Sequence, residues 1–393
     1  MAREQNKSAY DPGEIDTKRI SRIRRMLLTW FDRQKRDLPW RRTRDPYAVW
    51  LSEMMLQQTQ VATVIPYYEK FMAQFPTVGR LADADLEDVL RLWSGLGYYA
   101  RARNLHRAAQ TVAAEHGGVF PATVDGLRAL PGIGAYTAGA VASIAFGKKA
   151  PVVDGNVARV LARLFEINAD VRDGVGLKLT WKIAGRMLPN KRCGDFNQAV
   201  MELGATVCLP KGAARCSACP LQSECQGFAS GTVSELPIKT RKTAVKNETH
   251  VVVAIERRGQ WLVVRRPKQG LWGGLWEMPT AVLNGEPTFT LARRLAADFS
   301  SIPVNIERKP FCTLKHQLSH RSITFVGHVC HLKRPVAGIG PKKPGKWLRL
   351  NELDGLGLST AMRNVFFALR KTVEKSNGRA AGNATKCKKK VTS

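Results

Sequence analysis

The sequence predicts two domains, an all-α domain followed by a smaller α+β domain. The chain has 393 residues, which is long for a single hydrophobic core. Helical signals, with apolar residues three and four apart, extend from Thr17 to Phe228, and strand signals replace them further along. We therefore expect a disordered N-terminus at 1–17, a helical domain at 18–228, a linker at 229–248, an α+β domain at 249–370 and a basic tail at 371–393.

Glycine and proline divide the helical part into segments. A helix is predicted from Pro46 through 47–64, and others at 84–93, 105–116 and 124–130. A further helix carries an apolar stripe at i, i+3, i+4, i+7 and i+8, which we expect to face the core. The residues of this stripe are Val157, Val160, Leu161, Leu164 and Phe165.

The α+β part begins with a predicted hairpin. Two apolar runs, Val251–Ile255 and Trp261–Val264, flank a turn around Gly259. A third strand is expected at 323–332, where β-branched and aromatic residues concentrate. Ser359 then has the position of an N-cap for a last helix at 360–375.

The charge of the chain indicates a polyanionic partner. Lys and Arg number 62 against 32 Asp and Glu, a formal net charge of +30. Such an excess favours nucleic acid, because neutralising phosphates releases condensed counterions. The basic run at 386–390 does not account for it, since basic residues occur throughout. The sequence shows no apolar signal segment and no membrane-length apolar run, so we expect a cytoplasmic protein with no membrane partner.

A glycine-containing turn separates two predicted helices at 130–137, which reads LPGIGAYT. The first helix breaks at Pro131, the chain turns through Gly132 and Gly134, and a second helix starts at Ala135. Such turns expose backbone N–H groups at a helix start, where they suit a phosphate oxygen. An ordinary helical hairpin is the alternative, but the P-G-I-G order favours phosphate binding.

Two carboxylates allow a catalytic or a structural interpretation. Glu53 interrupts the apolar run WLSEMMLQQTQ at 50–60. If buried, it would have a raised pKa and could act as a general acid; if it lies on a solvent-facing stripe, it has no such role. Asp154 stands just before a helix, where it could be only an N-cap or could also face a cleft and stabilise positive charge. The pattern alone leaves both questions open.

Four of the eight cysteines lie close together, with seven, two and five residues between them and no histidine in the set. Four thiolates at this density suit an iron–sulfur cluster or a structural zinc, and the spacing alone does not decide between them. A disulfide framework is not expected in a reducing compartment. The four residues are Cys208, Cys216, Cys219 and Cys225.

Together these motifs resemble the endonuclease III-like superfamily of helix–hairpin–helix DNA glycosylases, and within it the adenine DNA glycosylases of the MutY type. The resemblance extends from about Arg36 to His331. It rests on the runs LPWRR (38–42), VWLSEMMLQQTQV (49–61), LWSGLGYYARARNL (92–105), LPGIGAYTAGAV (130–141), VVDGNVARVLARL (152–164) and FNQAVMELGATVC (196–208). It implies a monomeric repair enzyme, associated with the nucleoid, that removes adenine mispaired with 8-oxoguanine or guanine in double-stranded DNA.

The resemblance also implies roles for single residues. Glu53 matches the general acid that protonates adenine at N7, and Asp154 matches the carboxylate that stabilises the oxocarbenium-like sugar. Asn156 matches a residue that orients this pair. Tyr136 occupies the position where lyase-competent relatives carry a lysine, and a tyrosine cannot form a Schiff base. The implied activity is therefore that of a monofunctional glycosylase.

Further residues match positions that contact DNA or the cofactor. Gln58 and Tyr98 match residues that wedge into the duplex beside the damaged pair. Residues that match the surroundings of the extruded adenine are Trp40, Arg41 and Gln198, and those that match the phosphate-binding turn are Gly132 and Gly134. The four clustered cysteines imply one [4Fe–4S] cluster per chain. The family's first gap is six residues and this one is seven, so we expect the extra residue to be accommodated at 209–215.

The α+β part resembles the family's Nudix-like domain, which recognises 8-oxoguanine. Its marker is the run GLWGGLW at 270–276, followed by His316 and His320. Leu318 stands where the lesion-contacting loop normally begins with an aromatic residue, and Ser319 could still donate a hydrogen bond. The stretch 291–298 lacks the paired glutamates that hold magnesium in a Nudix hydrolase. We therefore expect this domain to bind and not to hydrolyse.

Three other functions compete with this interpretation. They are a bifunctional endonuclease III-type glycosylase and lyase, a non-catalytic DNA-binding scaffold, and a nucleotide pyrophosphohydrolase. Tyr136 and the second domain argue against the first, and the missing glutamates argue against the third. Release of a base separates the scaffold from the glycosylases, and hydrolysis of an oxidised deoxyguanosine triphosphate would indicate the pyrophosphohydrolase.

Overall fold

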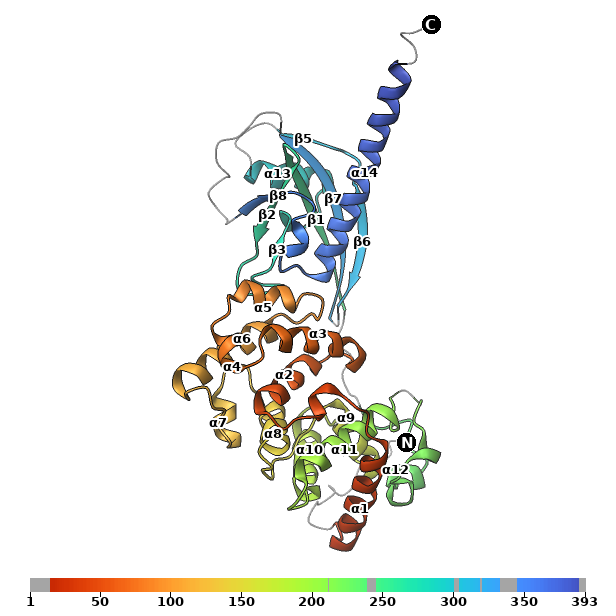
Figure 1. The fold of residues 1–393 in the computed structure, drawn as a ribbon. Coiled ribbons are helices and arrows are strands. Elements are labelled where there is room, and N and C mark those ends of the chain that lie inside the picture. The colour runs from red at the N-terminus through yellow and green to blue at the C-terminus, as the bar shows by residue number, and fades with distance from the viewer. Residues whose placement is uncertain are drawn as a thin grey trace. The chain divides into compact units, whose positions relative to one another are not determined.

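The computed structural model describes residues 15–210, 212–238, 245–299, 304–318, 320–332 and 345–388. The chain forms two compact units (Figure 1): Met1–Ala84 with Asn104–Lys242, and Asp85–Arg103 with Thr243–Ser393. The described part of the first unit is helical, and the second is built on a mixed sheet. Residues 85–103 fall inside the predicted helical domain, yet they pack with the α+β unit.

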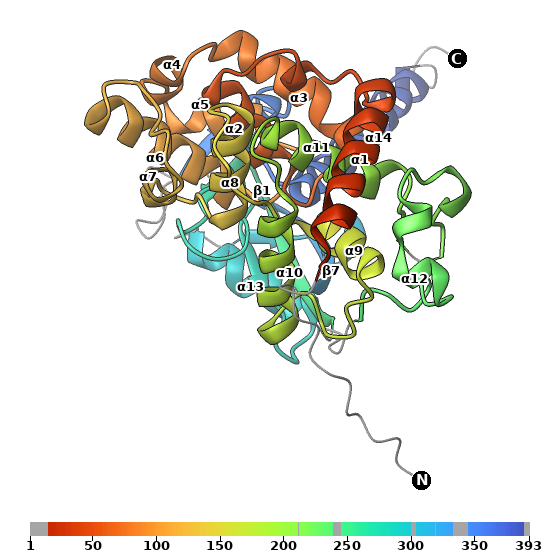
Figure 2. The same ribbon diagram turned by 90° about the horizontal axis from the view of Figure 1, so that it is seen from below.

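Short helices make up the first unit. Helix α11 packs against α9, α8 and α1, and Figure 2 shows α1, α9 and α11 side by side. The segments are α1 (Thr17–Gln34), η2 (Pro39–Arg41), α2 (Pro46–Leu56), α3 (Val61–Gln74), α4 (Val78–Ala82), α6 (Ala100–Glu115), which starts in the second unit, α7 (Val124–Ala129), α8 (Ala135–Ile144), α9 (Gly155–Leu164), α10 (Gly174–Met187), α11 (Cys193–Thr206), η3 (Cys216–Ala218), η4 (Gln222–Glu224) and α12 (Gln226–Ala229).

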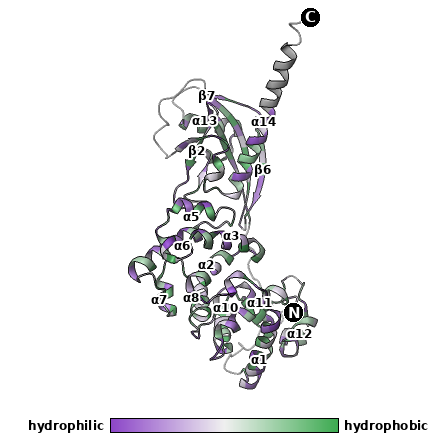
Figure 3. Ribbon diagram, viewed as in Figure 1, coloured by the Kyte–Doolittle hydropathy of each residue, from purple (hydrophilic) through white to green (hydrophobic). Residues whose placement is uncertain are grey.

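Amphipathic helices bury their apolar faces in the core of the first unit. The predicted stripe on α9 is confirmed, because all five of its residues are buried. Helix α1 contributes a second stripe, and the hydropathy colouring in Figure 3 marks this helix with both apolar and polar bands. The buried residues of α1 are Ile20, Ile23, Leu27 and Phe31.

The single helix predicted across 46–64 is wrong. Helix α2 ends at Leu56, and α3 begins only at Val61. Between them Gln58 adopts a φ of 57°, a left-handed conformation that side-chain-bearing residues seldom take. No glycine or proline marks this turn, so the helical pattern runs through it without a visible break.

The described residues of the second unit form one eight-stranded sheet with the order β3-β2-β1-β7-β5, while β4 pairs with β1, β6 with β7 and β8 with β2. Strands β1 and β7 are parallel and the other pairs are antiparallel. The bounds are β1 (Lys246–Arg257), β2 (Gln260–Arg265), β3 (Trp276–Glu277), β4 (Thr280–Val282), β5 (Val304–Ile306), β6 (Cys312–Gln317), β7 (Arg321–Leu332) and β8 (Gly345–Leu348), with helices α5 (Leu86–Leu92), α13 (Thr288–Phe299), η5 (Leu353–Gly355) and α14 (Thr360–Lys388).

The predicted hairpin is confirmed. Arg257 pairs with Gln260, and the two residues between them, Arg258 and Gly259, have φ values of 52° and 77°. Two consecutive left-handed residues are typical of a type I′ turn, whose twist matches that of antiparallel strands. Strand β1 begins at Lys246, inside the range predicted as a linker.

Helices cover both faces of this sheet. Val251 and Val253 on β1 share an apolar cluster with α13, whereas Val252 and Ala254 share another with α14. This alternation explains why the middle of β1 is apolar without interruption. The predicted cap of the last helix is confirmed by the Met362 N–H, which donates to Ser359 Oγ at 3.1 Å. The helix continues past the predicted end at 375 to Lys388.

Within the described residues, none of the helices combines the length and the apolar character that crossing a membrane requires.

Candidate active site

A cavity of about 650 Å³ opens in the first unit. Side chains from α2, the turn after α2, α8, the start of α9 and α11 line it, together with residues 36–41. The size lies in the range of small-molecule pockets, roughly 300–1,000 Å³. Both carboxylates that the sequence singles out, Glu53 and Asp154, line this cavity.

Glu53 is buried, with 5% of its surface exposed. Helix α2 is enclosed on every side, since each residue from Tyr47 to Met55 is buried, so a solvent-facing stripe does not exist. Burial raises the pKa of Glu53 from 4.5 to about 7, the hydrogen bond from Tyr136 opposes this rise, and the nearby Asp154 carboxylate adds to it. Glu53 can therefore hold a proton near neutral pH.

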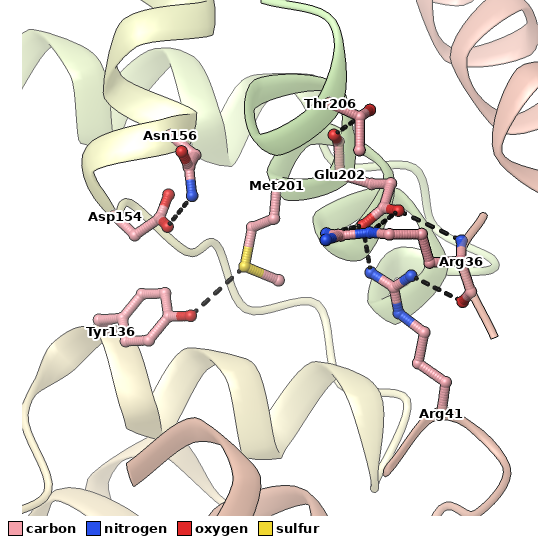
Figure 4. Close-up of polar contacts among 8 residues, drawn as sticks. All are labelled: Arg36, Arg41, Tyr136, Asp154, Asn156, Met201, Glu202 and Thr206. Carbon is pink, nitrogen blue, oxygen red and sulfur yellow. Dashed lines mark hydrogen bonds and ion pairs between the residues drawn. The ribbon is translucent and has the colours of Figure 1, made fainter. Parts of the chain in front are cut away.

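Tyr136 lies in the first turn of α8 and reaches the same carboxyl group. Its hydroxyl donates a hydrogen bond to Glu53 Oε2 at 2.5 Å. The same hydroxyl lies 3.4 Å from the sulfur of Met201, and Figure 4 shows this second contact. Burial raises the pKa of Tyr136 well above its usual range, so the phenol stays protonated and remains a donor. This bond fixes the orientation of the Glu53 carboxyl group.

Asp154 is both an N-cap and a cavity residue. Its Oδ1 accepts the Val157 N–H at 2.7 Å, which caps α9, and its Oδ2 accepts the amide of Asn156 at 3.0 Å. Burial raises the pKa of Asp154, and these two hydrogen bonds oppose the rise. Asp154 therefore caps α9 and lines the cavity at the same time, so the two interpretations of this residue are both compatible with the structure.

Asn156 is itself held from behind. Its Oδ1 accepts from Arg159 at 2.8 Å, and Arg159 also donates to the carbonyl oxygens of Gly204 at 2.7 Å and Cys208 at 2.8 Å. A Cβ atom on Gly204 would lie 2.7 Å from the Cβ of Asn156, so only glycine permits this approach of α11 to α9. The orientation of Asn156 follows from close packing as well as from hydrogen bonds.

An ion-pair cluster around a buried glutamate forms the cavity wall next to Asp154 and Asn156. Glu202 on α11 is 1% exposed and binds two arginines, Arg36 at 2.6 Å and Arg41 at 2.8 Å (Figure 4). Burial alone would raise the pKa of Glu202, but the two arginines outweigh it and lower the pKa to about 2. The cavity is therefore lined by Glu53, which can keep its proton near neutral pH, and by Glu202, which is ionised at that pH.

The cavity gathers eight of the residues that the sequence predicts for the site. They are Trp40, Arg41, Glu53, Gln58, Tyr136, Asp154, Asn156 and Gln198. Gln58 belongs to the turn between α2 and α3, and the left-handed backbone there turns the chain along the edge of the cavity.

Comparisons with known proteins agree with this arrangement. Residues 51–182 match the family of HhH-GPD superfamily base excision DNA repair proteins, and residues 250–367 match the NUDIX domain. The human adenine DNA glycosylase is 39% identical over 412 residues, covering 89% of this chain and 74% of that protein. The chain belongs to the adenine DNA glycosylase family.

A second adenine DNA glycosylase supports the assignment, and a solved structure supports the fold of the helical part. The adenine DNA glycosylase of Buchnera aphidicola subsp. Baizongia pistaciae (strain Bp) is 31% identical over 347 residues, covering 88% of this chain and 96% of that protein. A solved structure of a thermostable thymine-DNA glycosylase is 30% identical with a TM-score of 0.50, covering 54% of this chain and 98% of that chain. These findings confirm the predicted family, the glycosylase class and the fold class, a helix–hairpin–helix domain followed by a Nudix-like domain.

The predicted phosphate-binding turn lies between α7 and α8. Gly132 has a φ of 76°, and a Cβ there would lie 2.5 Å from the Cβ of Asn104, so glycine is required. Gly134 is the N-cap of α8, and no side chain caps this helix start. Amide donors at an uncapped helix start are available to an anion.

The four clustered cysteines line a small cavity of about 30 Å³ in the first unit. Arg163 lies behind them and donates to the sulfur of Cys208 at 3.3 Å. Among the residues that the structure describes, no three His, Cys, Asp or Glu side chains form a group that could hold a metal ion. Four thiols around one cavity are nevertheless the donor set that iron–sulfur clusters use, and members of this family are expected to carry such a cluster.

The remaining predicted residues belong to the second unit. Tyr98 lies in the turn between α5 and α6 and is 45% exposed, with a φ of 49°. His320 is exposed just before β7, Leu318 is half-buried just after β6, and Ser319 lies outside the described residues. The helix α13, which spans the stretch that lacks paired glutamates, contains Asp298 as its one acidic residue.

Glu202 was not among the predicted site residues. It shares its sequence signal with Glu53, since each is a lone acid in an apolar helical run, here FNQAVMELGATVC. Arg36 was also absent from the prediction, although it precedes the predicted Trp40 and Arg41 by a few residues. The pairing of Glu202 with two distant arginines depends on tertiary structure and has no local signal.

Proposed function

We propose that this chain removes adenine from double-stranded DNA by hydrolysing its N-glycosidic bond, and that the preferred site is adenine opposite 8-oxoguanine, with adenine opposite guanine as a weaker substrate. The observation that carries the proposal is a shared cavity lined by two carboxylates in different electrostatic environments. A base inside a duplex cannot reach a cavity, so the adenine must be extruded from the stack.

Glu53 supplies the proton in this proposal. Adenine leaves poorly as an anion, and protonation at N7 makes it a better leaving group. A carboxyl group whose pKa is about 7 is still substantially protonated at neutral pH and is a strong enough acid to transfer its proton. The hydrogen bond from Tyr136 holds the carboxyl group in one orientation, and the other oxygen remains available to the base or to water.

Asp154 stabilises the sugar as the bond breaks. An oxocarbenium-like deoxyribose carries positive charge, and a nearby carboxylate that is already in position lowers its energy. The hydrogen bonds from Val157 and Asn156 favour the ionised form of Asp154 against the effect of burial. Water then attacks C1′ of the sugar and gives its proton to the Glu53 carboxylate, which regains its starting form, and an abasic site remains in the DNA.

The activity is monofunctional in this proposal. A lyase step requires a lysine amine that attacks the sugar, and Tyr136 stands at the position where the resemblance implies that lysine. Tyr136 is also engaged, since its hydroxyl bonds to Glu53. The second unit supports the proposed preference for 8-oxoguanine. Its fold is that of a nucleotide-binding Nudix domain, but α13 lacks the paired glutamates that would hold magnesium for hydrolysis, so the domain is suited to binding the lesion.

Base release tests the proposal directly. Purified protein is incubated in single turnover with duplexes that carry adenine opposite 8-oxoguanine, guanine or thymine, and free adenine is measured. We expect release from the first, slower release from the second and none from the third. Borohydride should trap no covalent adduct. Absence of released base would contradict the proposed glycosylase and favour the DNA-binding scaffold, and a trapped adduct would indicate a lyase.

The pH dependence should follow the ionisation of Glu53. Because the protonated form is the active one, the single-turnover rate constant should fall as pH rises through about 7. The Tyr136 hydrogen bond lowers the pKa of Glu53, so Tyr136→Phe should move this fall to higher pH. The measurement is a pH–rate profile of both proteins. A fall that stays in place, or moves to lower pH, would contradict the assignment.

The four cysteines are proposed to hold one [4Fe–4S] cluster. Arg163, whose guanidinium contacts Cys208, also donates to the carbonyl oxygens of Leu209 at 2.8 Å and Leu236 at 3.0 Å and so joins the two ends of the cysteine segment. Between these ends the large apolar side chains are sparse, and Leu221 is the one buried among the described residues. The order of this segment therefore depends on what the cysteines bind, which would be a structural contribution of the cluster.

Loss of one ligand should disorder this segment. Cys219→Ser should lower the iron content and the visible absorbance of anaerobically purified protein, and limited proteolysis should cut within 209–235. Cys330→Ala is the matched control, because that cysteine is buried in β7 and should leave iron content unchanged. Unchanged iron in Cys219→Ser would contradict the assigned ligand.

A further inference from the structure

The exposed turn at Tyr98 is built into the second unit. Helix α5 ends at Leu92 and α6 starts at Ala100, and between them Gly97 and Tyr98 have φ values of 73° and 49°. A large exposed aromatic side chain on a left-handed backbone is strained, and such strain persists only where the surrounding structure holds it.

Two buried hydroxyl groups flank this turn and share one acceptor. Ser94 and Tyr99 are each 3% exposed, and they donate to the carbonyl oxygen of Leu358 at 2.6 Å and 2.8 Å. The Gly95 N–H donates in turn to the Tyr99 hydroxyl at 3.1 Å. Both ends of the turn are therefore attached to the same carbonyl group of the C-terminal part of the chain.

That carbonyl group is itself fixed by the sheet. Leu358 forms a bridge with Trp276 on β3, and the Trp276 N–H donates to the Gly357 carbonyl oxygen at 3.0 Å. A second attachment lies beyond the turn, where Arg103 donates to the carbonyl oxygen of Gly273 at 2.5 Å. The segment that presents Tyr98 is thus connected to the Nudix-like fold on both sides.

Arg101 stiffens the turn from inside. This arginine is 7% exposed, its guanidinium donates to the carbonyl oxygens of Leu96 and Gly97 at 3.2 Å each, and it lies 5.5 Å from the centre of the Tyr98 ring. A cation over an aromatic face is favourable, and here it holds the ring against a buried support.

We propose that Ser94 and Tyr99 are positioning residues through which the lesion-recognising domain holds the Tyr98 wedge. The inference rests on the proposed function and on the role that the resemblance implies for Tyr98, which is insertion into the duplex beside the mispair. A wedge works only when it resists being pushed back by the base stack, so its support must be rigid. In this molecule the two hydroxyl groups and the Leu358 carbonyl provide that support, and they make the wedge a part of the Nudix-like unit.

The test compares Tyr99→Phe in two backgrounds. Dissociation constants are measured for a duplex with a non-hydrolysable adenosine analogue opposite 8-oxoguanine. Loss of one hydrogen bond to a fixed support should weaken binding by about five-fold in the otherwise unchanged protein. In a Tyr98→Leu background the same change should cost less than about two-fold, because the residue that it positions is gone.

Two controls separate positioning from folding. Asp88→Ala removes an exposed ion pair with Arg91 on α5, the helix that precedes the turn. This variant should bind the duplex with a dissociation constant within about two-fold of the wild-type value. Ser94→Ala removes the other donor to Leu358, should reproduce the result, and replaces Tyr99→Phe if that variant does not fold.

Equal weakening by Tyr99→Phe in both backgrounds, or none in either, would overturn the inference. Wild-type affinity in Tyr98→Leu alone would overturn it as well, by removing the wedge. The proposed function fails separately, through the absence of adenine release by the unmodified protein.

Discussion

Glu53→Gln should lower the single-turnover rate of adenine release by about 10²–10⁴-fold, the usual contribution of a general acid. Glutamine keeps the size of the side chain and still accepts the hydrogen bond from Tyr136, but it has no proton of suitable acidity to transfer. Binding of a duplex with adenine opposite 8-oxoguanine should be retained, because the geometry of the cavity stays the same.

The same substitution should stabilise the folded protein at high pH. The pKa of Glu53 is raised from 4.5 to about 7 in the folded state, a difference of about 3 kcal/mol in favour of the protonated form. A raised pKa adds stability below 4.5 that is lost as pH rises through about 7. Glutamine has no such loss, so the variant should unfold at a higher temperature than the wild type above pH 7.

Glu69→Gln is the matched control, since this glutamate is exposed on α3 and should leave both rate and stability unchanged. An inactive Glu53→Gln that is also less stable above pH 7 would indicate a structural defect instead of a lost acid. Full activity in Glu53→Gln would remove Glu53 from the mechanism.

Asp154→Asn should slow base release by about 10²–10³-fold, as expected when one preorganised electrostatic group is removed. The variant separates the two roles of this residue. Asparagine is as good an N-cap as aspartate, so α9 keeps its cap on the Val157 N–H. The amide cannot carry the negative charge that the sugar requires, and its NH₂ group no longer accepts from Asn156.

The thermal stability of Asp154→Asn should therefore change little, by about 1 kcal/mol for one lost hydrogen bond. Asp16→Asn is the control, because Asp16 caps α1 through the N–H groups of Lys18 and Arg19 and does not line the cavity. It should show a similarly small stability change with the rate intact. If both variants kept their rates, Asp154 would be only a cap.

Local patterns predicted the parts of the fold whose signal is local. The α9 stripe and the hairpin at Gly259 follow from periodicity and turn chemistry, and both are confirmed. The turn at Gln58 has no such signal, because a glutamine there takes a left-handed backbone for reasons set by the surrounding fold. The predicted helix therefore ran through the point where the cavity opens.

The site could be predicted only in part for a related reason. Periodicity could not tell whether Glu53 is buried, because α2 is buried on all sides and its pattern has no polar face to compare. The resemblance identified the two carboxylates, but Glu202 and its arginines come from α11 and from residues before α2. Their pairing appears only when the chain is folded.

The attachment of residues 85–103 to the second unit has a consequence for inheritance. Leu90 on α5 is buried, and a Cβ atom on Gly357 would lie 3.4 Å from the Cβ of Leu90. Helix α5 therefore packs closely against the C-terminal part of the second unit, although it precedes that part by more than 150 residues in the sequence. Recombination that exchanged only the coding sequence after the linker would combine the sheet of another protein with the α5 helix of this one. We therefore expect that the Nudix-like unit exchanges functionally only together with residues 85–103, and that substitutions in the two parts are correlated among relatives.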